Sequence, residues 1–239
     1  MKIIKNKNAK NLLLIFSVLV LILVFYLIYK HTKESFNDLI EFQFYDINEN
    51  LQKNTEWNME VEEQIALQKY LNKDDNILQL GGNIGLSCIM ADKILNNESK
   101  NICVEPHPKV LPILKKNKIL NNSNYIIIEG AITNETNLKI KDTDPNFLAS
   151  TVQKTGDIPI KTIKLYDIKD INKINVLFAD CEGCLCGFLE EYPNFIKQIR
   201  LIIFEQDMPH LCDYAKIKNI LVENKFSNIE DKFVNVWKK

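Results

Sequence analysis

An unbroken apolar segment near the N-terminus is the strongest hydrophobic feature of the chain. Residues 12–29 are apolar except for Ser17, and no polar stripe interrupts them. A helix of these residues would be about 27 Å long, close to the hydrocarbon thickness of a bilayer. A signal peptide has a shorter apolar core followed by small residues, whereas Lys30, His31 and Lys33 follow here. We therefore expect one retained transmembrane helix that contacts the lipid bilayer.

The charges around this segment predict its orientation. Lysines precede it at positions 2, 5, 7 and 10, whereas acidic residues soon follow Lys30 and Lys33. The positive-inside bias favours a cytosolic N-terminus, with the remaining chain on the lumenal or exoplasmic side. The expected organisation is an anchor over residues 1–33, a linker over 34–56 and a single domain over 57–239.

Beyond the linker, short apolar runs alternate with amphipathic segments. This pattern is typical of a parallel α/β sheet, whose strands are buried on both faces. Predicted strands cover residues 76–80, 101–104, 125–128, 160–165, 175–179 and 201–204. Predicted helices cover about 61–71, 84–95, 108–120, 185–196 and 211–223. Alternation at period two over 226–229 and 233–237 adds a terminal hairpin. The predicted fold is a Rossmann-like, doubly wound, mostly parallel seven-stranded sheet with a C-terminal antiparallel hairpin.

Composition narrows the choice of partners. The 239 residues, 46% of them hydrophobic, can bury one substantial core. Thirty basic residues against 31 acidic ones give a net charge of −1. Such a chain has no general positive field to attract nucleic acid, so we expect no nucleic-acid partner.

A glycine-rich turn after the first predicted strand of this sheet is the sharpest local motif. The sequence ILQL is followed by Gly81, Gly82, Asn83, Ile84 and Gly85. Glycines let the backbone turn tightly and approach a ligand that a Cβ atom would exclude. A dinucleotide fingerprint needs G-x-G-x-x-G, which the chain lacks. The turn suits the G-x-N-x-G loop that holds the methionine part of S-adenosyl-L-methionine.

Acidic residues end three of the later strands. Glu105 follows the strand NICV, 20 residues beyond Gly85, where it can accept hydrogen bonds from both ribose hydroxyls of an adenosine. Asp180 and Glu182 follow NVLFA, and Glu205 follows LIIF. Ligands sit beyond the carboxyl ends of parallel strands, so we expect Asp180 and Glu182 to border both the cofactor's methyl group and the acceptor. One of the three later carboxylates could orient an acceptor hydroxyl or take its proton.

Small residues also end the strand YIII. Gly130 and Ala131 follow it, and they would let an adenine ring lie flat against the backbone. An ordinary strand exit would have the same composition. Both residues are therefore candidates for the cofactor site.

Six cysteines remain, three of them in the sequence DCEGCLC. Cys181, Cys184 and Cys212 with His210 could form a zinc site, or disulfides could form in an oxidising compartment. Cysteines at a strand end and a helix start also serve as small buried hydrophobes. We expect no metal, and His210 is either a surface residue or a base near the acceptor.

Residues 57–239 resemble the FkbM-type methyltransferases, a branch of the class I S-adenosyl-L-methionine enzymes. The resemblance rests on the sequences GGNIG, VEPHP, TIKLYDI, DCEG, LIIFE and VNVWKK. It implies O-methylation of a hydroxyl on a small molecule, sugar or glycan acceptor. Two residues depart from it, because Gln79 replaces a usual acid and Leu185 replaces a frequent Glu. These departures leave open a membrane-tethered interaction module without turnover. A nicotinamide oxidoreductase is a separate alternative, which the missing G-x-G-x-x-G motif disfavours.

Overall fold

The computed structural model describes residues 16–24, 39–142 and 150–239. The chain forms two compact units, Met1–Leu39 and Ile40–Lys239. In the first unit, residues 16–24 are helical and their large apolar side chains are exposed. The other residues of the expected transmembrane helix lie outside the described residues. Within the described part of the chain, no helix combines the length and apolarity needed to cross a membrane.

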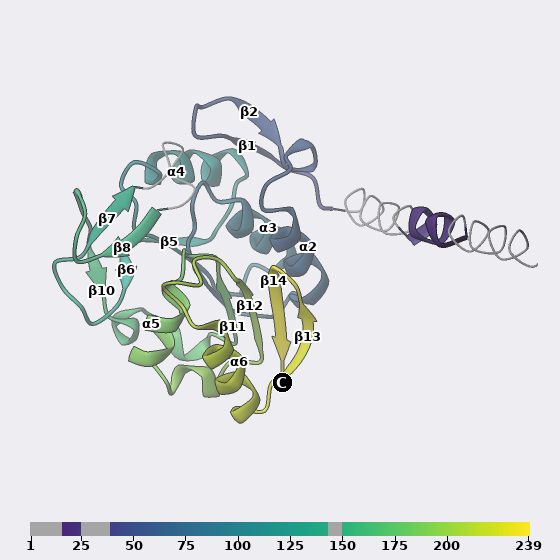
Figure 1. Ribbon diagram of the computed structural model, residues 1–239. Coiled ribbons are helices and arrows are strands. Elements are labelled where there is room, and N and C mark those ends of the chain that lie inside the picture. The colour runs from purple at the N-terminus through teal and green to yellow at the C-terminus, as the bar shows by residue number, and fades with distance from the viewer. Residues whose placement is uncertain (1–15, 25–38, 143–149) are drawn as a thin grey trace, which may run out of the picture. The chain divides into compact units, whose positions relative to one another are not determined.

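The second unit is built on a seven-stranded sheet with the strand order β13-β14-β12-β11-β3-β4-β5 (Figure 1). All neighbouring strands are parallel except at β14, which is antiparallel to both β12 and β13. The prediction of a mostly parallel sheet with a terminal hairpin is thus confirmed. The strands are β3 (Ile77–Leu80), β4 (Asn101–Glu105), β5 (Ile126–Glu129), β11 (Val176–Ala179), β12 (Leu201–Glu205), β13 (Ser227–Asp231) and β14 (Val234–Lys238).

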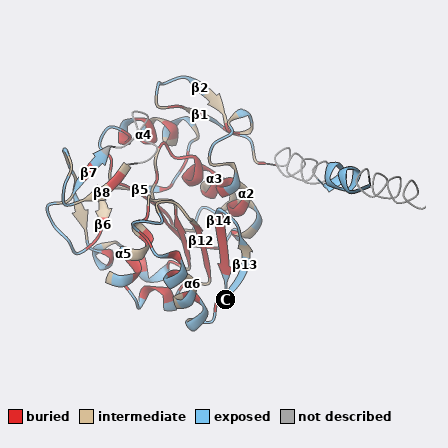
Figure 2. Cartoon of the chain, viewed as in Figure 1, coloured by how far each residue is buried: buried red, intermediate tan, exposed pale blue. Residues whose placement is uncertain are grey.

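Helices cover both faces of this sheet, as its central strands require. Every residue of β3 and β11 is buried, and the strands β12 and β14 are largely red in Figure 2. Alternate residues point to opposite faces. Leu78 and Leu80 belong to the core cluster that also holds side chains of α5 (Cys184–Glu191) and α6 (Tyr214–Glu223). The other face is covered by α2 (Val61–Tyr70), α3 (Leu86–Ile94) and α4 (Leu111–Leu120) (Figure 1).

The five predicted helices are all shorter than the sequence pattern predicts, and local chemistry explains the difference for two of them. The helix expected over residues 185–196 ends at Glu191, two residues before Pro193. Proline lacks an N–H and disfavours helical geometry at the residue before it. The helix expected from residue 211 begins at Tyr214, because Oδ1 of Asp213 accepts hydrogen bonds from the first backbone N–H groups.

The chain between β5 and β11 differs most from expectation. The single strand predicted over residues 160–165 is reduced to β10 (Thr162–Ile163), which the short helix η2 (Leu165–Asp167) follows. Another short strand, β9 (Ile158–Pro159), precedes β10. None of them joins the main sheet. β10 pairs with β6 (Ala131–Ile132), while β9 belongs to a three-stranded sheet with β7 (Lys139–Asp142) and β8 (Ser150–Gln153).

Part of the expected linker is structured. Residues 34–56 include β1 (Gln43–Tyr45), β2 (Leu51–Lys53) and the short helix η1 (Asn54–Glu56). The backbone N–H of Tyr45 donates to Oδ1 of Asn117 in α4 at 2.6 Å, and Nδ2 of Asn117 donates to the Tyr45 carbonyl at 2.9 Å. The compact unit therefore begins before residue 57. Two more short helices, η3 (Ile171–Lys173) and η4 (Phe195–Lys197), complete the unit.

Candidate active site

A cavity of about 730 Å³ opens at the carboxyl ends of the central strands. Its walls come from the ends of β3, β4, β11 and β12, the start of α2, the loop before α5, and the small sheet of β7 and β8. The strand order changes direction beside β3, because β4 lies on one side of it and β11 on the other. This is the switch point at which open α/β sheets bind their ligands.

The loop after β3 approaches the backbone at the end of β11 closely. Gly81 lines the cavity at φ +86°, and a Cβ atom there would lie 1.6 Å from the carbonyl oxygen of Asp180. Gly85 has φ +102° and begins α3. Asn83 also lines the cavity, whereas Gly82 packs under the loop, where a Cβ atom would meet Cys103 Sγ at 2.4 Å.

Glu105 joins this loop to the end of β4. Its Oε2 accepts the backbone N–H of Asn83 at 2.7 Å, and its Oε1 accepts the backbone N–H of His107 at 2.6 Å. Burial raises the pKa of Glu105 to about 7, although these hydrogen bonds act in the opposite direction. Glu105 lines the cavity, so its remaining lone pairs can accept hydrogen bonds from a bound ligand.

Asp180 is the centre of a group of carboxylates. It follows β11 and shares a hydrogen bond with Glu205 at the end of β12. Burial, followed by the bond to Asp180, raises the pKa of Glu205 to about 11. Burial also raises the pKa of Asp180. The two carboxyl groups therefore hold one proton between them over a wide pH range.

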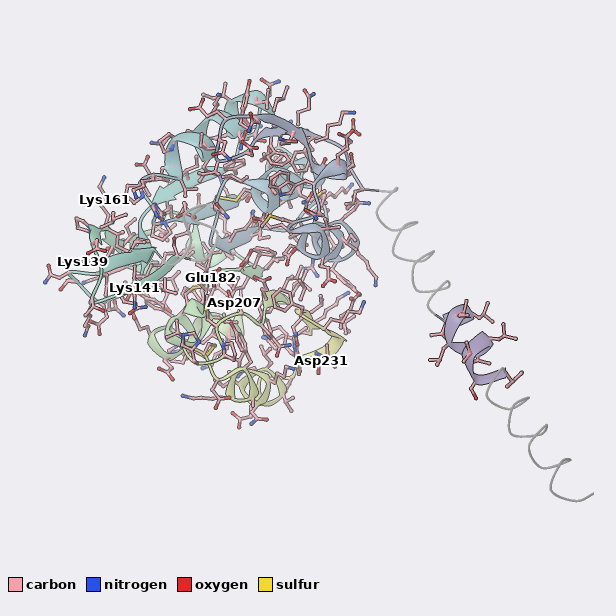
Figure 3. All side chains as sticks on the ribbon, turned by 45° about the horizontal axis from the view of Figure 1, so that its top comes forward. Lys139, Lys141, Lys161, Glu182, Asp207 and Asp231 are labelled. Atoms are coloured by element: carbon pink, nitrogen blue, oxygen red, sulfur yellow. A yellow bond between two sulfur atoms is a disulfide. The ribbon has the colours of Figure 1, made fainter. Side chains whose placement is uncertain are left out.

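Glu182 and Asp207 lie near each other (Figure 3). The charge of Asp207 acts on both Glu182 and Glu205. Glu182 adopts the left-handed conformation at φ +54° and lines the cavity. Burial and the nearby charges of Asp207 and Asp180 raise its pKa to about 7. Oδ1 of Asp207 accepts hydrogen bonds from the Gly183 N–H at 2.9 Å and the Tyr214 hydroxyl at 2.6 Å. Asp207 therefore supports the turn that carries Glu182.

Metal coordination is one chemical possibility for this group. Carboxylate oxygens of Asp180, Glu205 and Asp207 lie within 4.8 Å of one another. Hard divalent cations prefer such oxygen ligands. A proton shared between Asp180 and Glu205 satisfies the same geometry without a metal, so the spacing alone assigns none.

Four acidic residues that line the cavity are absent from the sequence-based prediction, namely Glu60, Glu63, Glu135 and Glu191. The first two lie at the start of α2. Glu60 precedes α2 in the left-handed conformation, and Glu63 is buried in its first turn. Burial and then the Asp180 charge raise the pKa of Glu60, and burial raises the pKa of Glu63 to about 7. Their sequence context, an amphipathic helix rich in charge, gave no sign that they face the strand ends.

The remaining predicted residues divide between the cavity and its surroundings. Ala131 lines the cavity, but Gly130 is not among the lining residues and packs against the Lys161 backbone. His210 is exposed and outside the lining. Gln79 is buried and donates to Oδ1 of Asn101 at 2.6 Å, on the side of the sheet away from α5. Leu185 is buried in the core cluster instead of facing the cavity.

All six cysteines form disulfides. They are therefore neither zinc ligands nor free buried thiols in this structure. Cys88 of α3 is bonded to Cys103 of β4. Cys181 is bonded to Cys184 across the turn that carries Glu182, and Cys186 of α5 is bonded to Cys212 before α6. Disulfides are one of the three states that the sequence allows, beside a zinc site and buried free thiols.

Comparison with known proteins finds no matching family model and no curated protein with a significant sequence match. Several solved structures are similar. One is precorrin-6y C5,15-methyltransferase from Geobacter metallireducens, with 15% identity, coverage of 74% of this chain and 87% of that one, and a TM-score of 0.48. An O-methyltransferase from Bacillus cereus, solved in complex with SAH, has 14% identity, coverage of 74% and 79%, and a TM-score of 0.46.

TYW2 from M. jannaschii, solved in complex with AdoMet, has 13% identity, coverage of 82% and 83%, and a TM-score of 0.44. Similarity of this degree assigns neither a cofactor nor an acceptor to the present chain. Its function has to be argued from its own cavity.

Proposed function

We propose that the domain binds S-adenosyl-L-methionine and transfers its methyl group to a hydroxyl of a small molecule, sugar or glycan. The observation that carries this proposal is an acid-rich cavity directly above the glycine turn of β3. Glu60, Glu63, Glu105, Asp180 and Glu182 all line it. S-adenosyl-L-methionine carries a positively charged sulfonium and a positively charged ammonium. The carboxylates that line the cavity, here called the acidic wall, attract both charges.

The same charge pattern disfavours a nicotinamide dinucleotide. Its pyrophosphate is anionic and normally rests on unobstructed backbone N–H groups at a helix N-terminus. Here the N–H of Asn83 is already bonded to Glu105. Lys139, Lys141 and Lys161 of the neighbouring segment are not among the lining residues (Figure 3). Lys154 does line the cavity, but its ammonium is paired with Glu135 at 2.9 Å.

Each part of the cavity has a proposed role. Gly81 and Asn83 accommodate the methionine part, in a turn that Gly82 and Gly85 shape from outside the cavity lining. Glu105 accepts the ribose hydroxyls, and Ala131 borders the adenine, while Gly130 lies behind it against Lys161. The cofactor supplies an electrophilic methyl group. Asp180, which follows the central strand β11 and lines the cavity, is the carboxylate that we assign to the acceptor.

The acceptor hydroxyl must lose its proton as its oxygen forms the new bond to carbon. Asp180 orients this hydroxyl, and the ionised form of Glu182 is a suitable base because its pKa lies near neutral pH. The proton shared by Asp180 and Glu205 reduces repulsion among these carboxylates. Glu205 therefore acts mainly on the protonation of Asp180.

Calorimetry on the Ile40–Lys239 unit tests this proposal. We expect measurable binding of S-adenosylmethionine and S-adenosylhomocysteine and none of NAD. Screening hydroxylated lipids, glycans and small molecules with radiolabelled cofactor then seeks the acceptor. Cofactor binding without transfer to any of them would favour an interaction module that keeps the fold, and NAD binding alone would contradict the proposal.

We further propose that residues 12–29 anchor the chain in a membrane with the N-terminus in the cytosol. The apolar composition of this segment and the four preceding lysines support it. Deletion of residues 1–33 should release the domain into the soluble fraction, while protease protection in sealed vesicles reports its side. Membrane association that persists after the deletion would contradict an anchor limited to this segment.

A further inference from the structure

The three disulfides differ in their access to solvent and to the cavity. Cys88 and Cys103 are completely buried. Cys186 is partly exposed, but its partner Cys212 is 1% exposed and neither of the two lines the cavity. Cys181 and Cys184 are both partly exposed, and both line the cavity. Thiol–disulfide exchange requires direct attack on a sulfur atom, so access determines which bond a small thiol can reach.

We propose that the Cys181–Cys184 disulfide is a thiol–disulfide exchange site that is reached through the cavity and discriminates against anionic thiols. The pair lies in the strand-to-helix turn between β11 and α5, with only Glu182 and Gly183 between the two cysteines. This activity is separate from methyl transfer and needs neither cofactor nor acceptor. The reductant is a low-molecular-weight thiol or dithiol.

The position of α5 indicates which sulfur leaves. Cys184 is the first residue of this eight-residue helix, and unpaired N–H groups at a helix N-terminus stabilise a thiolate. An incoming thiolate therefore attacks Sγ of Cys181 and forms a mixed disulfide. The Cys181–Cys184 bond breaks, and its electron pair leaves on Sγ of Cys184, which then takes up a proton.

A second thiol completes the reduction. It attacks the reductant's sulfur in the mixed disulfide and releases Cys181, which also takes up a proton. Two electrons and two protons have then reached the protein, and two thiols have become one disulfide. Exchange in the opposite direction restores the Cys181–Cys184 bond.

The acidic wall sets the charge preference. Glu182 lies within the disulfide ring, Asp180 directly precedes Cys181, and Asp207 accepts the Gly183 N–H. An anionic thiol such as glutathione is repelled by these carboxylates, whereas the ammonium of cysteamine is attracted. Because the interaction is electrostatic, added salt should weaken the preference.

Reduction of the Cys181–Cys184 bond would also change the conformational freedom of a residue that lines the cavity. The disulfide closes a ring around Glu182, which holds a left-handed conformation that a residue with a Cβ rarely adopts. After reduction, the remaining local restraints include the hydrogen bonds from Cys184 N to the Cys181 carbonyl at 3.3 Å and from Gly183 N to Asp207. The side chain of Glu182 therefore gains freedom when the bond opens.

Graded reduction of the native full-length protein in detergent tests the site. After treatment with increasing dithiothreitol, free thiols are alkylated and located by peptide mass spectrometry, while circular dichroism monitors folding. Cys181 and Cys184 should be modified at a concentration at least about tenfold lower than Cys186 and Cys212. Simultaneous modification of both pairs, or earlier modification of Cys186 and Cys212, would overturn the assignment.

The charge preference has its own test with cysteamine and glutathione at equal thiolate concentration. Both rates are normalised to reaction with a small uncharged disulfide. We expect a preference for cysteamine of about tenfold at low salt that shrinks at 0.5 M salt and in Glu182→Gln. Equal normalised rates would refute the charge selection. Neither assay uses S-adenosylmethionine, so failure here is distinguishable from failure of the proposed methyl transfer.

Discussion

The backbone N–H of Asn83 donates to Oε2 of Glu105 at 2.7 Å and thereby connects the loop after β3 to the end of β4. One side chain thus organises the glycine turn and also faces the cavity beside it. Charge at this position affects loop geometry and ligand binding together. Separating the two effects requires a substitution that keeps the shape of the side chain.

Replacement of Glu105 should weaken cofactor binding. Glu105→Ala removes a charged hydrogen-bond acceptor, a loss of about 1–3 kcal/mol, or about 5- to 150-fold in affinity. Glu105→Gln keeps the volume and one acceptor oxygen, so its loss should be smaller. Calorimetry with S-adenosylhomocysteine measures both. Affinity equal to that of the parent in both variants would mean that the cofactor site is misplaced.

Gly81 and Gly187 provide a matched pair for testing the close approach of backbone in the cavity. Both glycines line it, but a Cβ at Gly81 would meet Asp180 backbone, whereas a Cβ at Gly187 meets nothing within 4 Å. Gly81→Ala should lower cofactor affinity at least tenfold or prevent folding. Gly187→Ala should fold and could gain about 0.5–1 kcal/mol from its position inside α5. Thermal melts and calorimetry distinguish these outcomes, and equal behaviour would contradict the packing.

The sequence predicted those parts of the site that depend on local chain geometry. Gly81 and Glu105 could be identified because each lies at the carboxyl end of a strand, and these ends define the binding edge of a parallel sheet. Glu63 could not, because its approach to Asp180 depends on how α2 packs. The disulfide partner of Cys186 was equally hidden, since 26 residues separate it from Cys212. Both features depend on packing between segments that are far apart in the sequence, which the local pattern of residues does not encode.

Glu63 should make the stability of the domain depend on pH. Burial raises the pKa of its carboxyl to about 7, so the folded protein binds a proton there more tightly than the unfolded chain does. The stabilisation is fully present below the unfolded pKa of about 4.5 and is lost as pH rises to about 7. Its maximum is about 3 kcal/mol for a shift of this size.

Denaturant unfolding of the parent and Glu63→Gln between pH 4 and pH 8 isolates this contribution. Glutamine resembles the protonated acid and does not titrate. The free energy of unfolding of the parent should fall relative to the variant across this range and then stay at a constant difference above about pH 7.5. A difference that does not change with pH would show that Glu63 has an ordinary pKa.

Asp180 should be the carboxylate most needed for turnover. It leaves the central strand β11 and shares a proton with Glu205, while its charge also acts on Glu60, Glu63 and Glu182. Methyl transfer requires the acceptor oxygen and the methyl carbon to be held about 3 Å apart, and misplacement can reduce the rate about 100-fold. Asp180→Asn keeps the shape of the side chain but removes its charge and basicity.

We therefore expect Asp180→Asn to retain the fold and most cofactor affinity but to lower the methylation rate about 100-fold. His210→Ala is the control, because His210 is exposed and outside the cavity lining, and its rate should match that of the parent. Single-turnover transfer from radiolabelled cofactor to an acceptor found by screening provides the measurement. Asp180→Asn could instead keep the full rate while Glu205→Gln abolishes methylation. The essential carboxylate would then be Glu205 of β12, and the role of Asp180 would be limited to the proton that it shares with Glu205.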